Sequence, residues 1–141
     1  MSCMAVKAKE LRYAVDLTDA GTLTEENGVV LELPAEWSPE HLLLAALVRC
    51  SLKSLHYHAE RKGVTVSSAS GSSRTVVTKR ETDDRYALVE TKLALVLALE
   101  PEPSVAALAE LLGLAERDCF VASSLTAEPT YRWVVNGRAL A

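Results

Sequence analysis

The chain has 141 residues, a formal net charge of −4 and 49% hydrophobic residues. These values indicate a single globular domain over residues 1–141 and exclude a disordered chain. No block of Lys and Arg stands out, so we expect no nucleic-acid partner, and no apolar run reaches about 18 residues, so we expect no membrane span. The N-terminus lacks the pattern of a secretion signal, and three cysteines are too few for a disulfide framework. We therefore expect a cytoplasmic protein with free thiols.

The first third of the chain has the pattern of a β-sheet. Apolar and polar side chains alternate over residues 11–17 and again over residues 29–33. Turn residues stand at 19–21 and 26–28, each triplet ending in glycine. This pattern predicts a meander of three short antiparallel strands with one face in solvent.

A long helix is predicted next, from Pro39 to Lys62. Ser38 is a suitable N-cap, Pro39 fits the first helical position, and Gly63 is typical of a helix end. Residues 42–48 are apolar on every side of the helix, so every side must be covered. Because a chain of this size has little left to cover it, we infer that a second copy does so, which predicts a homodimer.

The rest of the chain alternates between strands and helices. We expect one long or broken strand over residues 64–79, a second over 86–99 and a helix beginning near Val105. A short helical turn capped by Asp118 follows, and then a last strand that carries three side chains on one face, Tyr131, Trp133 and Val135. The order predicts an α+β fold with antiparallel sheets packed around a long buried central helix.

Two cysteines carry the candidate chemistry, although each is also explained as a packed core residue. Cys50 lies in the middle of the long helix with Lys53 one turn further on, where an ammonium favours a thiolate. Arg49 lies about 100° round that helix. Cys119 stands at a predicted helix start, which favours its own thiolate.

The histidines are not spaced for a shared metal ion, since His56 and His58 diverge by about 200°, and we expect no metal and no cofactor.

Two segments resemble motifs of the OsmC/Ohr family, the osmotically inducible and organic-hydroperoxide-resistance proteins. Residues 38–50, SPEHLLLAALVRC, resemble the central-helix motif, in which Pro-Glu opens the helix and a cysteine follows ten residues after the Glu. Residues 119–125, CFVASSL, resemble the second-cysteine motif Cys-Pro-Val-Ser-x-x-Leu. The resemblance covers nearly the whole chain. It implies an intertwined homodimer with two active sites at the subunit interface.

The resemblance also implies a thiol peroxidase. Cys50 would be the peroxidatic thiolate that becomes a sulfenic acid, and Cys119 the resolving thiol that forms a disulfide with it. A dithiol donor, in the family often a lipoylated protein, would reduce that disulfide. The apolar surroundings of Cys50 suit an alkyl or lipid hydroperoxide. Glu40 lies about 15 Å from Cys50 along one helix, so it would assist only from the partner subunit or across a break in the helix.

A second interpretation is that the chain is a non-catalytic relative that binds a small apolar ligand at the same interface. It is favoured by the loop over residues 19–24, which has no Arg where the hydroperoxide-resistance proteins carry one that stabilises the thiolate. Arg49 and Lys53 are the candidates to replace that charge. The second motif also differs, with Phe120 in place of Pro and Ala122 in place of Ser. A third interpretation is that the chain forms a structural dimer in which the thiols have no chemical role.

Overall fold

The computed structural model describes residues 8–140, which form two compact units that join between Ser38 and Pro39. A single domain over residues 1–141 stays a prediction, because each unit is held together by its own contacts. Among the helices of residues 8–140, none combines the length and the apolarity that a membrane crossing requires.

The first unit is a three-stranded antiparallel sheet in the order β1-β2-β3. Its strands are β1 (Val15–Leu17), β2 (Thr22–Glu25) and β3 (Val30–Glu32). The predicted meander is therefore confirmed. Every residue of β1 and β3 is exposed, because strands this short bury a face only against a second layer, and residues 8–38 form none.

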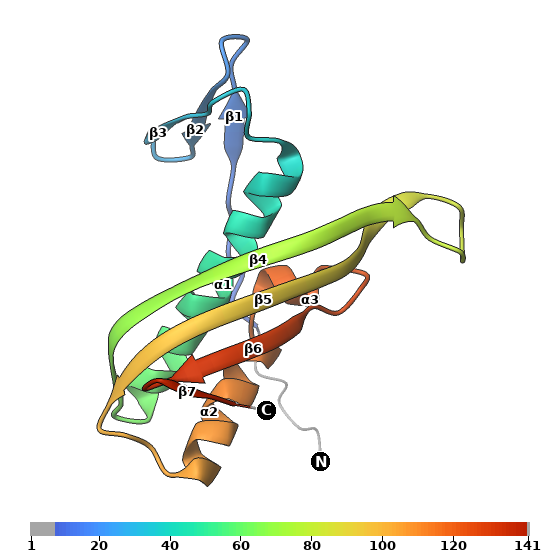
Figure 1. The fold of residues 1–141 in the computed structure, drawn as a ribbon. Coiled ribbons are helices and arrows are strands. Elements are labelled where there is room, and N and C mark those ends of the chain that lie inside the picture. Colours follow the sequence, from blue (N-terminus) through green and yellow to red (C-terminus); the bar gives the residue numbers. More distant parts are fainter. Residues whose placement is uncertain (1–7, 141) are drawn as a thin grey trace, which may run out of the picture. The chain divides into compact units, whose positions relative to one another are not determined.

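The second unit is built on α1 (Pro39–Arg61), which confirms the long predicted helix. It ends as predicted, since Gly63 has a φ of 71° and its N–H donates to the carbonyl of Glu60. The remaining elements are β4 (Thr65–Lys79), β5 (Tyr86–Glu100), α2 (Val105–Arg117), α3 (Phe120–Ser123), β6 (Thr130–Val135) and β7 (Arg138–Ala139). The four strands form one sheet in the order β4-β5-β6-β7, which lies across α1 (Figure 1).

This sheet is antiparallel except at one pair. β6 runs parallel to β5, with Leu93 opposite Tyr131 and Leu97 opposite Val135. The expectation of purely antiparallel sheets is therefore wrong here. The physical reason is the connection: the chain passes through α2 and α3 between the two strands, and a crossover of that length permits parallel pairing.

The core lies between the sheet and α1. Alternate residues of β5 point inward and are at most 2% exposed, as the alternation of a strand requires; they are Leu93, Leu95, Leu97 and Leu99. Leu47 and Leu55 of α1 and Leu111 of α2 meet them. The first half of α1 is less covered, since Leu42, Leu43 and Leu44 are only partly buried. The chain by itself thus buries the central helix mainly in its second half.

Candidate thiol site

The structure brings the two predicted cysteines together. Cys50 lies in the middle of α1 and Cys119 is the N-cap residue of α3, and the two thiols are near enough for Cys119 to raise the pKa of the Cys50 thiol. Both are free thiols. They differ in access, because Cys119 is 0% exposed whereas Cys50 is only partly buried. Cys50 is therefore the more accessible of the two residues in the single chain.

Opposing effects act on the Cys50 thiol, and the balance raises its pKa. Burial is the largest effect, and the neighbouring Cys119 raises the pKa further. The backbone N–H groups of Val121 and Phe120 donate to the sulfur and lower the pKa. These N–H groups lie at the start of α3, where a helix leaves its amides without internal partners. The helix start that the sequence suggested would serve Cys119 thus supplies donors to Cys50.

The other predicted site residues lie apart from the thiols within one chain. Arg49 and Lys53 are exposed on α1, and no charged side chain of residues 8–140 is among the groups that shift the pKa of Cys50. Glu40 is exposed at the second position of α1, about 15 Å from Cys50 along the helix axis. A role for any of the three stays a prediction.

Two hydroxyl groups that sequence reasoning missed complete the surroundings of Cys119. Ser51 Oγ lies 3.4 Å from Cys119 Sγ and 3.0 Å from the hydroxyl oxygen of Tyr131. Ser51 is fully buried, and the ring of Tyr131 stacks on that of Trp133 with centroids 5.8 Å apart. A serine directly after a candidate cysteine was the available signal, but the contact also depends on β6, which is 80 residues further on.

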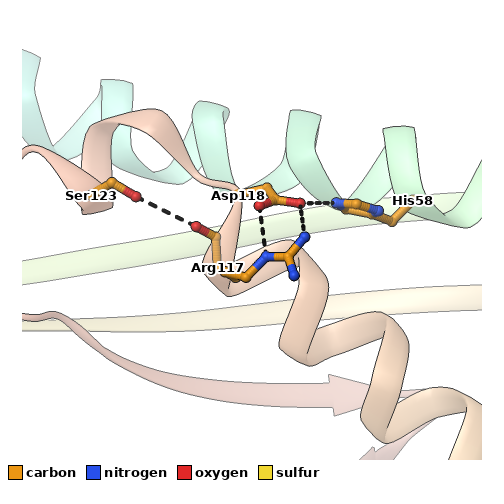
Figure 2. Close-up of polar contacts among 4 residues, drawn as sticks. All are labelled: His58, Arg117, Asp118 and Ser123. Carbon is orange, nitrogen blue, oxygen red and sulfur yellow. Dashed lines mark hydrogen bonds and ion pairs between the residues drawn. The ribbon is translucent and has the colours of Figure 1, made fainter. Parts of the chain in front are cut away.

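A polar cluster beside Cys119 ties α2 to α1 (Figure 2). Asp118 Oδ2 lies 2.7 Å from His58 Nε2, and both Asp118 oxygens accept from the Arg117 guanidinium. Arg117, and to a smaller extent His58, hold the pKa of the Asp118 carboxyl below its usual range. The prediction that Asp118 caps the short helix is wrong. Asp118 is the C-cap of α2, and its carboxylate is occupied by Arg117 and His58.

Metal binding has no support in the part of the chain that the structure describes. No three side chains among its His, Cys, Asp and Glu residues are placed to hold an ion. His58 lies against a carboxylate in a cluster that also includes a guanidinium. The groups gathered around the two sulfurs are two backbone amides and two hydroxyl groups.

The sequence profile described as OsmC-like protein matches residues 33–134. No curated protein matches the chain. Three solved structures share its fold. An OsmC-like protein of unknown function from Vibrio cholerae has a TM-score of 0.73 at 17% identity, over 90% of this chain and 100% of that one. The organic hydroperoxide resistance protein OhrB of Bacillus subtilis has a TM-score of 0.53 at 16% identity, over 89% and 96%. An organic hydroperoxide resistance protein OsmC from Legionella pneumophila has a TM-score of 0.56 at 15% identity, over 92% and 98%.

Proposed function

The chain belongs to the OsmC-like family, and we propose that it is a cytoplasmic, thiol-dependent peroxidase that reduces organic hydroperoxides in defence against oxidative stress. The observation that carries the proposal is the pairing of a partly exposed thiol, Cys50, with a fully buried one, Cys119. Two of the structural neighbours are described as organic hydroperoxide resistance proteins, which agrees with this chemistry.

In the first step the Cys50 thiolate attacks the terminal oxygen of the hydroperoxide. The S–O bond forms as the O–O bond breaks, so the sulfur is oxidised to a sulfenic acid and the alkoxide leaves and takes up a proton as the alcohol. The amides of Phe120 and Val121 stabilise the attacking thiolate, since hydrogen bonding from them lowers the pKa of the Cys50 thiol. Apolar neighbours in the first half of α1 favour an alkyl or lipid substrate over hydrogen peroxide.

In the second step Cys119 attacks the sulfur of the sulfenic acid. The S–S bond forms, hydroxide leaves as water, and the enzyme holds a Cys50–Cys119 disulfide. An external dithiol, for which a lipoylated protein is our candidate, returns both thiols by exchange.

The active unit in this proposal is a homodimer. The reason is that the single chain exposes apolar side chains. Val15, Leu17 and Leu31 in the strands of the first unit are 66%, 65% and 56% exposed. The first half of α1 is only partly covered. Exposed apolar surface of this kind is typical of interfaces. In the dimer we expect Glu40 of the partner subunit, or Arg49 or Lys53, to act on Cys50.

A second candidate function is binding of a small apolar ligand at the dimer interface without turnover. The raised pKa of Cys50, together with the lack of a cationic group acting on it within residues 8–140, favours this alternative. A slow thiol in an apolar setting would bind such a ligand and leave it unchanged.

The test is hydroperoxide consumption by the reduced protein. Cumene hydroperoxide and dithiothreitol are supplied to the wild type and to Cys50→Ser, and loss of peroxide is followed. We expect turnover by the wild type and loss of it in the variant, with sizing near twice the chain mass. Folded wild type that consumes no more peroxide than Cys50→Ser would remove the enzymatic proposal and leave the ligand-binding one.

A further inference from the structure

A chain of two hydroxyl groups ends at the sulfur of Cys119. Cys119 Sγ lies 3.4 Å from Ser51 Oγ, which lies 3.0 Å from the Tyr131 hydroxyl. Ser51 and Cys119 are both 0% exposed, whereas Tyr131 is half-buried. The chain therefore leads from a sulfur without access to water toward a group nearer the surface, and it joins α1, the start of α3 and β6.

The resolving step requires that Cys119 lose its proton, and the Ser51 and Tyr131 hydroxyls are placed to accept it. The nucleophile in disulfide formation is the thiolate, so Cys119 must lose its proton before it attacks Cys50. A buried anion without hydrogen-bond donors is strongly disfavoured. The proton must also leave a site that water does not reach.

We propose that Ser51 and Tyr131 form a hydroxyl relay that carries the proton away from Cys119 and then holds the resulting thiolate. This inference rests on the peroxidase proposed above and deepens it. Ser51 contacts a reacting sulfur and is a catalytic residue in this scheme. Tyr131 acts through Ser51 and is a positioning residue.

A single transfer along the relay both removes the proton from Cys119 and leaves the two hydroxyls oriented to stabilise the thiolate. The Cys119 proton passes to Ser51 Oγ, the Ser51 proton passes to the Tyr131 oxygen, and the Tyr131 proton leaves to water. Afterwards both hydroxyls donate toward the sulfur, so the new thiolate accepts a hydrogen bond from Ser51, which itself accepts one from Tyr131. The thiolate then displaces hydroxide from the Cys50 sulfenic acid. The Cys119 sulfur is oxidised, the Cys50 sulfur is reduced, and the hydroxide combines with the proton that the relay released to form water.

The chemistry of Tyr131 suits this role. Burial is the largest of the effects that raise the pKa of its hydroxyl, so Tyr131 remains protonated and available as a donor at neutral pH. Stacking on Trp133, with the rings 6° from parallel, fixes the ring and hence the direction of the hydroxyl. A residue with an apolar body and one polar tip can thus lie in the core and still serve Ser51.

The experiment compares Ser51→Ala with Ser54→Ala in a background that carries Cys3→Ser, because Cys3 is the third cysteine of the chain and lies outside the described residues. Ser54 lies one turn further along α1, is also buried, and its hydroxyl has no hydrogen-bond partner among the described residues. It is therefore a matched control for the loss of a hydroxyl from the same helix. Disulfide formation is timed by mass spectrometry after one equivalent of cumene hydroperoxide, and separately after diamide. Diamide first modifies Cys50, so Cys119 must make the same attack although no peroxide is reduced.

We expect Ser51→Ala to slow disulfide formation about 10- to 100-fold with both oxidants, the size expected for a lost hydrogen bond to a charged group. The sulfenic acid should accumulate and be trapped by dimedone in this variant. Ser54→Ala should match the wild type. A Ser51→Ala rate equal to that of Ser54→Ala with diamide would overturn the relay, and so would a wild type in which diamide forms no Cys50–Cys119 disulfide.

Tyr131→Phe gives a second variant that keeps the ring and its stacking. We expect a slower resolving step and a smaller rate difference between H₂O and D₂O than in the wild type, a readout that altered packing alone would not change. An unchanged isotope effect would overturn the role of Tyr131. If the wild type does not react with cumene hydroperoxide but the variants still differ from it in the rate of disulfide formation with diamide, the peroxidase proposal fails and the relay stands.

Discussion

Gly71 offers a sharp test of how α1 packs on the sheet. Gly71 lies in β4 opposite Leu95 of β5. A Cβ added to Gly71 would lie 2.4 Å from Leu95 Cδ2 and 3.2 Å from Val48 Cγ1 of α1. Nearby, Ser73 Oγ donates to the carbonyl of Leu44 at 3.1 Å, so strand and helix are close here. Leu95 is 0% exposed, so any shift of its side chain must be taken up by the packed core around it.

The expected cost of Gly71→Ala follows from that contact. An overlap this large forces Leu95 or α1 to shift, and overpacking of a closed core typically costs about 1–3 kcal/mol. For a chain of this size that loss lowers the melting temperature by roughly 3–10 °C. Because Val48 is two residues before Cys50, a displaced helix should also slow formation of the Cys50–Cys119 disulfide.

Thermal denaturation followed by circular dichroism measures the effect, and Gly113→Ala is the control. Gly113 lies in the middle of α2, and a Cβ there meets no atom within 4 Å. Alanine is preferred over glycine inside a helix by about 1 kcal/mol, so this variant should melt higher than the wild type. A Gly71→Ala protein that melts at or above the wild-type temperature would refute the close approach of α1 to β4.

Three further predictions concern single side chains. Cys119→Ser should still consume one equivalent of cumene hydroperoxide per chain and accumulate a dimedone-reactive Cys50; a protein that takes up none would contradict the order of the thiols. Ser54→Ala should be at least as stable as the wild type in urea, because it removes a buried hydroxyl without a partner. Asp118→Asn should destabilise the protein at neutral pH, since Arg117 and His58 lower the pKa of that carboxyl. A lowered pKa contributes stability above the usual carboxyl range that is lost as the pH falls, so the difference from the wild type should shrink below about pH 4. A urea series over pH that shows a constant difference would contradict this assignment.

Local signals were sufficient for the regular elements of the fold. The start of α1 could be predicted from Pro39 at the first helical position, and its end from Gly63 after the last turn. Both signals depend only on residues next to the helix end that they mark. The inward face of β5 follows from its alternating leucines. Parallel pairing of β5 with β6 could not be predicted in this way, because it depends on where the α2–α3 crossover returns the chain.

The same distinction applies to the site. The two cysteines could be identified because each lies in a short recognisable segment, residues 38–50 and 119–125. Ser51 and Tyr131 could not, since the contact between them joins residues 80 positions apart. Asp118 was assigned to the wrong helix end because its partner His58, 60 positions away, decides where the carboxylate points.

In the proposed mechanism, the order in which the two thiols act follows from their access to solvent more than from their acidity. A helix start was expected to favour Cys119, yet its amides point at Cys50, and Cys119 is the thiol that is closed off from solvent. A hydroperoxide cannot enter a site with no exposed surface, so Cys119 can react only with a sulfur that is already beside it. In the same mechanism, burial protects Cys119 from direct oxidation and keeps it reduced until Cys50 has been oxidised. This arrangement requires a local path for the Cys119 proton, and the Ser51 and Tyr131 hydroxyls are placed to provide one.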